Sequence, residues 1–106
     1  IFLQINIGKD PKKKGILKEE VATYCENIIQ KSNIKLIGVM VILPQNITDR
    51  QTLSLYLETR RIQKKINKKI KTCTETSMGM SKDFKIAIQA GATQIRIGSM
   101  LFGKRQ

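Results

Sequence analysis

The stretch Ser77-Met78-Gly79-Met80-Ser81 is followed, about twenty residues later, by Arg96-Ile97-Gly98-Ser99. Each stretch has the pattern of a short strand that runs into a turn of small, hydroxyl-bearing residues and then into a helix. Backbone N–H groups at such a helix start lack partners and attract an anion. Gly79 leaves room for close approach to the backbone, and Ser77 and Ser81 add hydroxyl donors. The two stretches therefore predict a phosphate cradle.

The second stretch repeats this chemistry with Gly98 and Ser99, and its strand pattern points Arg96 inward, toward whatever is bound. A simpler interpretation stays open at this point. The first stretch is then only a tight strand-to-helix turn, and Arg96 is a surface charge. Small Gly/Ser turns open many helices, so spacing alone does not separate the two interpretations.

The rest of the chain alternates strand and helix patterns. Apolar and β-branched runs predict strands over residues 1–7, 35–43, 73–78 and 94–97, and helical periodicity predicts helices over 16–31, over 51–71 and between Ser81 and Gly91. Right-handed parallel crossovers are the default for a β-α-β-α-β-α-β order with short connections. Four strands are half of a (β/α)8 barrel. We therefore predict an α/β fold in which residues 1–106 form one domain, with about four β/α units.

The predicted helix over 51–71 has two faces. We expect its apolar stripe to face the core and its basic row to face solvent. The stripe consists of Leu55, Ile62, Ile66 and Ile70, and the row of Arg61, Lys64, Lys65, Lys68, Lys69 and Lys71. Thr48 or Asp49 is suited to cap this helix.

The predicted third helix follows the first cradle stretch directly. Ser81 is expected at its N-cap and Asp83 in its first turn, where a negative charge complements the helix dipole. Its buried stripe is predicted to be Phe84, Ala87 and Ile88, and Gly91 is expected to end it.

Composition excludes several kinds of site. The chain has 106 residues, no histidine, and two cysteines, Cys25 and Cys73, outside any C-x-x-C pattern, so neither a zinc site nor an imidazole base is expected. Both thiols are expected to be buried and reduced, as in the cytoplasm. No apolar run is long enough to cross a bilayer. The chain begins at Ile1, and we expect it to be a piece of a longer polypeptide.

The formal net charge of +12 raises the alternative of a nucleic-acid-binding module. The basic helix offers no groove-reading motif and no aromatic residue among its charges beyond Tyr56. We therefore interpret the charge as a solvated surface, and we predict neither a specific nucleic-acid partner nor a membrane partner.

Several segments of the chain resemble the pyridoxal-phosphate homeostasis family (YggS/PROSC type), whose barrel is similar to the alanine racemase N-terminal domain. The most specific ones are Ser77–Phe84, Ala87-Ile88, Ala90–Thr93, Arg96–Ser99 and Phe102-Gly103. Earlier ones are Leu3-Gln4-Ile5-Asn6, Lys13-Lys14-Gly15-Ile16 and Ile37–Met40 ahead of Pro44. Thr76 departs from the family pattern, which usually has Leu there.

The resemblance implies a fold and a cofactor. The fold would be the C-terminal half of a (β/α)8 TIM-type barrel of pyridoxal-phosphate (PLP) fold type III. Phosphate sites of such barrels are frequent after strands seven and eight, the position implied for both cradle stretches. The implied PLP-binding residues are Ser77, Met78, Gly98 and Ser99 around the phosphate and Arg96 against the pyridine nitrogen; Ile97 is also implied to bind the cofactor.

The implied function is intracellular PLP homeostasis as a noncatalytic carrier or buffer. A guanidinium only donates hydrogen bonds, so the ring nitrogen beside Arg96 would be an unprotonated acceptor and a poor electron sink. The Schiff-base lysine of the family lies in a Ser-Lys motif on a first strand that this chain lacks. A missing N-terminal half-barrel would supply it, unless the gene is truncated or two copies pair as a homodimer. A PLP-dependent amino-acid racemase or decarboxylase is the enzymatic alternative, and the plastid stroma the alternative to the cytoplasm.

Overall fold

The computed structural model describes residues 1–8, 15–31, 33–44, 46–80 and 82–96. One parallel sheet has the order β1-β2-β3-β4, so neighbours in the sheet are neighbours in the sequence. The strands are β1 (Phe2–Gln4), β2 (Gly38–Met40), β3 (Glu75–Met80) and β4 (Gln94–Arg96). The helices are the short 3-10 helix η1 (Lys18–Glu20), α1 (Val21–Ile29), α2 (Asp49–Lys69) and α3 (Phe84–Gln89). The predicted α/β order of a partial β/α barrel is therefore confirmed.

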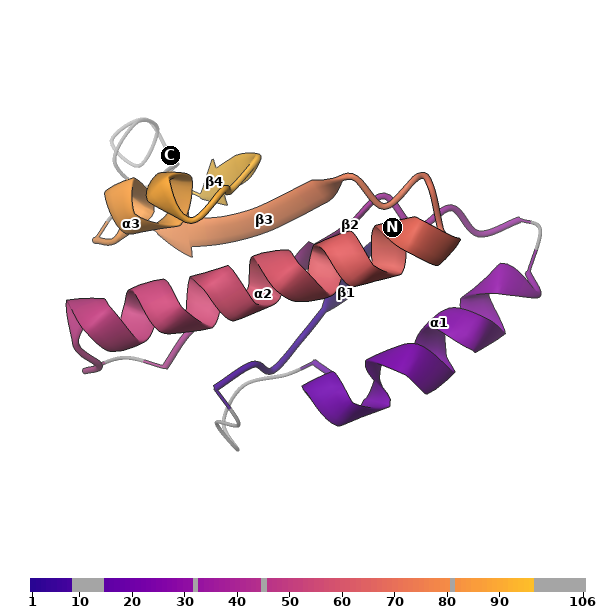
Figure 1. Ribbon diagram of the computed structural model, residues 1–106, viewed down its shortest axis with the longest axis horizontal. Helices are drawn as coiled ribbons and strands as arrows, with labels where there is room; N and C mark the ends of the chain where they lie inside the picture. The colour runs from indigo at the N-terminus through magenta and orange to yellow at the C-terminus, as the bar shows by residue number, and fades with distance from the viewer. Residues whose placement is uncertain (9–14, 32, 45, 81, 97–106) are drawn as a thin grey trace, which may run out of the picture.

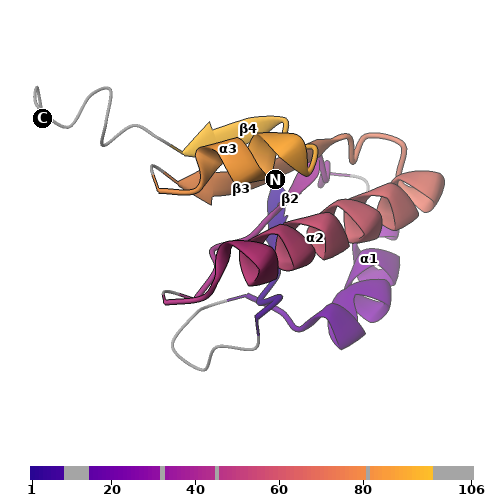
Figure 2. The same cartoon turned by 60° about the vertical axis from the view of Figure 1, so that its left-hand side comes forward.

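The helices gather on one side of this sheet. Right-handed crossovers between sequential parallel strands place every connecting helix on the same face. Figures 1 and 2 show the long helix α2 lying between α1 and α3. Strand residues that face this layer are fully buried, among them Val39, Val41 and Met78. Met40 and Ile42, which alternate with them, are only half-buried, because the described helices cover one face.

Helix α2 begins with a capping box at Thr48, one of the two caps that the sequence predicted. The Gln51 N–H donates to the Thr48 hydroxyl at 3.0 Å, and the Thr48 N–H donates to the Gln51 side-chain oxygen at 2.9 Å. Asp49 in the first turn and Lys68 and Lys69 in the last turn complement the helix dipole.

The buried stripe of α2 differs from the prediction. Leu55, Ile62 and Ile70 are only partly buried against the core, and Ile66 alone of the predicted stripe is fully buried. The most buried positions are Thr52, Tyr56, Thr59, Gln63 and Ile66. They recur every three or four residues, so the helix presents a mostly polar stripe to the sheet.

This polar stripe is tolerated because its groups have hydrogen-bond partners. The Thr52 and Thr59 hydroxyls donate to the carbonyls one turn back, at 2.9 and 2.8 Å. The Gln63 amide donates to the Cys73 carbonyl at 2.7 Å, which ties α2 to the loop before β3. Asn67 donates to the same carbonyl at 3.1 Å. A buried polar group with a partner avoids most of its desolvation penalty.

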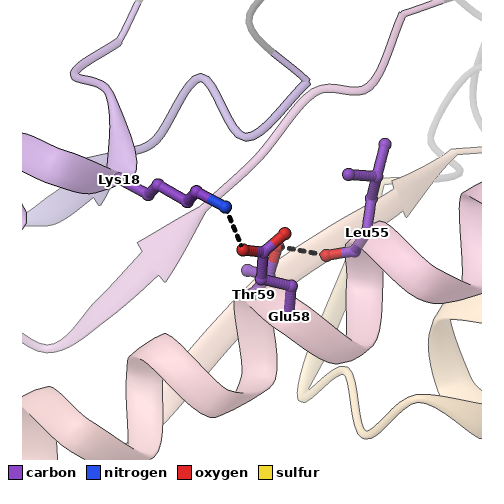
Figure 3. A network of polar contacts seen from close by, with 4 residues as sticks. All are labelled: Lys18, Leu55, Glu58 and Thr59. Atoms are coloured by element: carbon purple, nitrogen blue, oxygen red, sulfur yellow. Dashed lines mark hydrogen bonds and ion pairs between the residues drawn. The ribbon is translucent and has the colours of Figure 1, made fainter.

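An ion pair joins η1 to α2 across the outer surface. The Lys18 Nζ lies 2.6 Å from the Glu58 Oε2, and Figure 3 shows it beside the bond from Thr59 to the Leu55 carbonyl. The hydrogen bond to Glu58, and then its negative charge, raise the pKa of Lys18. Both side chains are partly exposed, so the pair adds little to stability.

The outer face of α2 is basic and exposed, as predicted, at Arg61, Lys64, Lys65, Lys68 and Lys69. No helix within the described ranges combines the length and apolar character needed to cross a bilayer.

Helix α3 confirms part of its prediction. Ala87 is fully buried, and Gly91 follows the C-cap residue Ala90 with a φ of +103°, the left-handed conformation that ends many helices. Ile88 is 54% exposed, so its predicted burial is wrong. Ile86 packs against the core instead.

Thr76 leaves a buried hydroxyl without a partner. Its side chain is 0% exposed, and its Oγ1 makes no hydrogen bond. We predict that Thr76→Val raises the free energy of unfolding of the full-length protein by about 1 kcal/mol, since the shape is kept and the desolvation penalty is removed. Urea unfolding measures this.

The matched control is Thr59→Val on α2, which is equally buried but removes a hydroxyl with a partner. It is expected to give no increase in stability. A Thr76→Val protein no more stable than wild type would contradict this account.

Both cysteines are free and buried, as predicted. Burial, and to a lesser extent the negative charge of a nearby Cys25 thiolate, together raise the pKa of Cys73 to about 11. The unfolded thiol, with its ordinary pKa of 9.0, loses its proton first. Stability from Cys73 is therefore full below about pH 9 and is lost as pH rises through about 11.

We predict that the free energy of unfolding falls over this pH range more in wild type than in Cys73→Ala. Equilibrium unfolding of both proteins at several pH values measures the difference. If the free energies of unfolding of the two proteins fell in parallel with pH, Cys73 would not be the group responsible for the loss.

Candidate functional site

A row of side chains crosses the sheet on the face away from the helices. The parallel register pairs Gln4 with Met40, Met40 with Ser77, and Ser77 with Gln94. Residues paired in register point to the same face, and the residues that alternate with them, such as Val39 and Thr76, are in the core. Three of the four side chains in the row are polar. This face therefore offers hydrogen-bonding side chains from three of the four strands, β1, β3 and β4.

Gln4 and Met40 are the last residues of β1 and β2, at the edge where ligands bind in parallel α/β sheets, whereas Ser77 lies within β3 and Gln94 begins β4. Ser77 is 6% exposed, Gln94 is exposed, and Gln4 is half-buried. Asn6, two residues beyond Gln4, is 9% exposed. The predicted polar face of the first strand is thus confirmed for Gln4 and Asn6.

The segment after the first loop borders this edge. The Ile16 N–H donates to the Gln4 carbonyl at 3.0 Å, and the Asn6 N–H donates to the Ile16 carbonyl at 2.7 Å. Ile16 therefore pairs with Ile5 as a parallel bridge, where the sequence analysis expected the beginning of a helix. Gly15 has a φ of +113°, which permits this close return of the chain. Lys13 lies outside the described residues.

Strand β3 contains a bulge where it meets β4. Ser77 pairs with Gln94 and Met80 pairs with Arg96, so three steps along β3 match two along β4. Gly79 supplies the extra residue with a φ of +106°. A Cβ added to Gly79 would lie 2.7 Å from the Ala87 Cβ. The space beside Gly79 is therefore filled by Ala87 of α3. The prediction that it would be open to a ligand is wrong.

The turn after β3 is held by one carboxylate. The Met80 N–H donates to the Asp83 Oδ1 at 2.8 Å, and the Asp83 N–H donates to the Met80 carbonyl at 3.1 Å. The Tyr56 hydroxyl donates to the Asp83 Oδ2 at 3.0 Å. Asp83 occupies the N-cap position of α3, so its predicted place in the first turn is wrong. Ser81, the predicted N-cap, lies outside the described residues.

The structure brings the described parts of the two cradle stretches, Ser77–Met80 and Arg96, side by side on adjacent parallel strands that end at the same edge. Ser77 lies in the polar row. The Met78 side chain is fully buried in the core, so only its backbone is available to a ligand. Arg96 ends β4 opposite Met80. The predicted site residues Ile97, Gly98 and Ser99 lie outside the described residues.

Gln94 and Tyr56 were not among the predicted site residues. Gln94 enters the row because it pairs in register with Ser77. The Tyr56 contact joins residues 27 positions apart, and no local pattern signals it. Within the described parts of the chain, no group of three or more His, Cys, Asp or Glu could hold a metal ion.

A match to a family model shows to which protein family the chain belongs. The model for the alanine racemase N-terminal domain matches residues 1–106. The chain belongs to the alanine racemase N-terminal domain family. The resemblance seen in the sequence is thereby confirmed.

Named relatives match along the whole length of this chain. The chain is 38% identical over 105 residues to the pyridoxal phosphate homeostasis protein of Synechocystis sp., covering 98% of this chain and 48% of the relative. It is 30% identical over 107 residues to the protein of that name from Aquifex aeolicus, covering 100% and 47%. The chain thus spans about half the length of these relatives.

Solved structures agree with the sheet topology. PipY of Synechococcus elongatus PCC7942, solved without PLP, superimposes with a TM-score of 0.88 at 33% identity. The match covers 96% of this chain and 48% of PipY. PipY with PLP bound gives a TM-score of 0.81 at 31% identity, with the same coverage. The four strands are therefore part of an alanine racemase N-terminal-type barrel.

The bulge at Gly79 leads to a stability prediction. Gly79→Ala is expected to lower the free energy of unfolding by at least about 2 kcal/mol, because a side chain disfavours the positive φ and meets Ala87. Urea unfolding of the full-length protein measures this loss.

A double variant separates the two causes. Adding Ala87→Gly removes the clash but leaves the backbone strain, so the double variant should lose less than the sum of the single losses. Strictly additive losses would show that the contact with Ala87 plays no part.

Proposed function

We propose that this chain is part of a PLP-binding protein of intracellular PLP homeostasis, which acts as a noncatalytic carrier or buffer of the cofactor. Two findings support this proposal. The relatives that match along the whole chain are named pyridoxal phosphate homeostasis proteins, and PipY, a structural neighbour, was solved with PLP bound.

One observation supports a binding site at particular residues. Strands β3 and β4 end side by side at the carboxyl edge of the sheet. In our proposal Ser77 and the Met78 N–H bind the phosphate from β3, and Gly98 and Ser99 bind it from the chain beyond β4. The donors suit the group, because a phosphate ester needs hydroxyl and N–H donors.

Arg96 would meet the pyridine nitrogen, and Ile97 is the remaining residue that we propose to bind the cofactor. A guanidinium only donates hydrogen bonds, so it holds the ring nitrogen unprotonated. Bound PLP supplies an electron-withdrawing ring, and an unprotonated ring withdraws electrons less strongly. Binding and handing on the cofactor therefore suits these residues better than racemase or decarboxylase chemistry.

The surroundings of the sheet support a noncatalytic role. None of the lysines in the described ranges lies on a strand. Tyr24 is on α1 and 43% exposed, and Tyr56 is on α2, buried on the helix side of the sheet. Neither is placed as an acid or base on the opposite face. We place the lysine that links covalently to PLP in the other half of the full-length protein.

We further propose that residues 1–106 form one domain, the C-terminal half of the barrel, which an N-terminal half-barrel completes. A second copy of this chain is the alternative partner. A reducing compartment, the cytoplasm, suits the two free, buried thiols.

A comparison of PLP with pyridoxal, which lacks the phosphate, tests the proposal. In the full-length protein, Ser77→Ala should weaken PLP binding about tenfold, the value of one hydrogen bond to a charged group. Pyridoxal binding should stay unchanged. Titrations followed by cofactor absorbance measure both affinities.

Ser54→Ala, an exposed serine on α2, is the matched control and should leave both affinities unchanged. Arg96→Gln should weaken PLP and pyridoxal alike, because both carry the ring nitrogen. A wild-type protein that binds PLP no more tightly than pyridoxal would refute the phosphate site. Steady turnover of amino acids by the purified protein would refute the noncatalytic role.

A further inference from the structure

We propose that Tyr56 is a positioning residue that acts through Asp83 to fix the paired ends of β3 and β4. It touches no cofactor itself. Its effect on PLP binding rests on the function proposed above, whereas its effect on the strand ends does not.

The Tyr56 side chain is itself held firmly. It is 1% exposed and lies in the core under the sheet, on the long helix α2. Its hydroxyl donates to the Asp83 Oδ2 at 3.0 Å. A buried phenol combines a large packed ring with one directional hydrogen bond, so the hydroxyl has a defined place.

Asp83 connects Tyr56 to the end of β3 through two hydrogen bonds with Met80. Its Oδ1 accepts the Met80 N–H at 2.8 Å, while its own N–H donates to the Met80 carbonyl at 3.1 Å. The carboxylate therefore joins two elements: one of its oxygens accepts a hydrogen bond from helix α2, and the other accepts one from strand β3. Turning it to release Tyr56 would disturb its bond to Met80.

The bulge makes Met80 depend on this support. Between Ser77 and Met80 the ladder to β4 is irregular, and Gly79 has a positive φ. A bulge disrupts the ladder locally, so the residue after it is less fixed by the sheet than one in a regular strand. Asp83 restrains Met80 from outside the sheet. Met80 is the register partner of Arg96, so the restraint reaches the end of β4.

The test begins without any ligand. In the full-length protein, Tyr56→Phe keeps the ring and removes the hydroxyl. Amide hydrogen exchange at Met80 should accelerate about tenfold, the value of a lost hydrogen bond to a charged group. The amide chemical shift of Arg96 should also move. Unchanged Met80 exchange and an unchanged Arg96 signal would overturn the inference, whether or not PLP binds.

Affinity for PLP is the second readout. Tyr56→Phe should weaken PLP binding about fivefold, within the range of one hydrogen bond. The matched control is Thr59→Val, almost one turn along α2, which removes a hydroxyl bonded within the helix. It should change neither Met80 exchange nor PLP affinity. Equal effects of the two variants would mean general loosening of α2 and would overturn the positioning role.

Variants of Asp83 distinguish positioning from packing. Asp83→Asn can still accept the Met80 N–H and can donate to the Tyr56 oxygen, so it should behave nearly as wild type. Asp83→Ala should accelerate Met80 exchange at least as much as Tyr56→Phe, because it also removes the acceptor of the Met80 N–H. The double variant Tyr56→Phe/Asp83→Ala should lose no more than Asp83→Ala alone, because both changes break one connection. Additive losses would overturn the connection.

The two proposals fail in different ways. Faster Met80 exchange with unchanged PLP affinity in Tyr56→Phe would overturn the role of Tyr56 in binding and leave the PLP site standing. Failure of the wild-type protein to bind PLP would overturn the proposed function, while the exchange and chemical-shift measurements would still decide the role of Tyr56 in the fold.

Discussion

The parallel register of the four strands is the constraint on which the rest of the molecule depends. Because each strand pairs with its neighbour in sequence, all crossovers run the same way and the helices lie on one face. The register also aligns Gln4, Met40, Ser77 and Gln94 in one row on the other face. A shift of one residue in β3 would exchange Ser77 for a core position and bury the wrong side of the strand. Core packing and the candidate site are therefore two results of the same alignment.

Much of the architecture could be predicted from local patterns. Continuous β-branched runs, helical periodicity and short connections predict the order of elements, and Thr48 and Gly91 mark helix ends through short-range chemistry. The buried stripe of α2 could not be predicted in the same way. Thr52, Tyr56, Thr59 and Gln63 resemble surface residues in a linear sequence, and only contacts formed in the folded chain make them suitable for burial. The exposure of Ile88 has the same origin, since helix packing and not periodicity decides which side of α3 is covered.

The candidate site also combines features that the sequence predicts with features that only the folded chain shows. The sequence indicated two small-residue stretches and one arginine, and the fold places Ser77 and Arg96 on adjacent strands at one edge. The bulge between them was not foreseen, because a glycine permits many conformations and its pattern does not reveal which neighbour comes close. The glycine in the sequence predicts space for a ligand at Gly79, whereas Ala87 occupies that space in the folded chain. The contact from Tyr56 to Asp83 is set by tertiary structure alone.

The polar stripe of α2 has a consequence for the geometry of the helix layer. Apolar contacts are nondirectional, so a helix held by leucines alone can turn slightly about its own axis and keep most of its burial. Hydrogen bonds from Tyr56 and Gln63 reach fixed points, at Asp83 and at the Cys73 carbonyl, and tolerate little rotation. Helix α2 is thus locked in its angular setting as well as in its depth. Replacing the polar stripe with apolar side chains of equal volume would preserve the amount of buried surface. It would remove the hydrogen bonds that fix the rotation of α2 about its own axis.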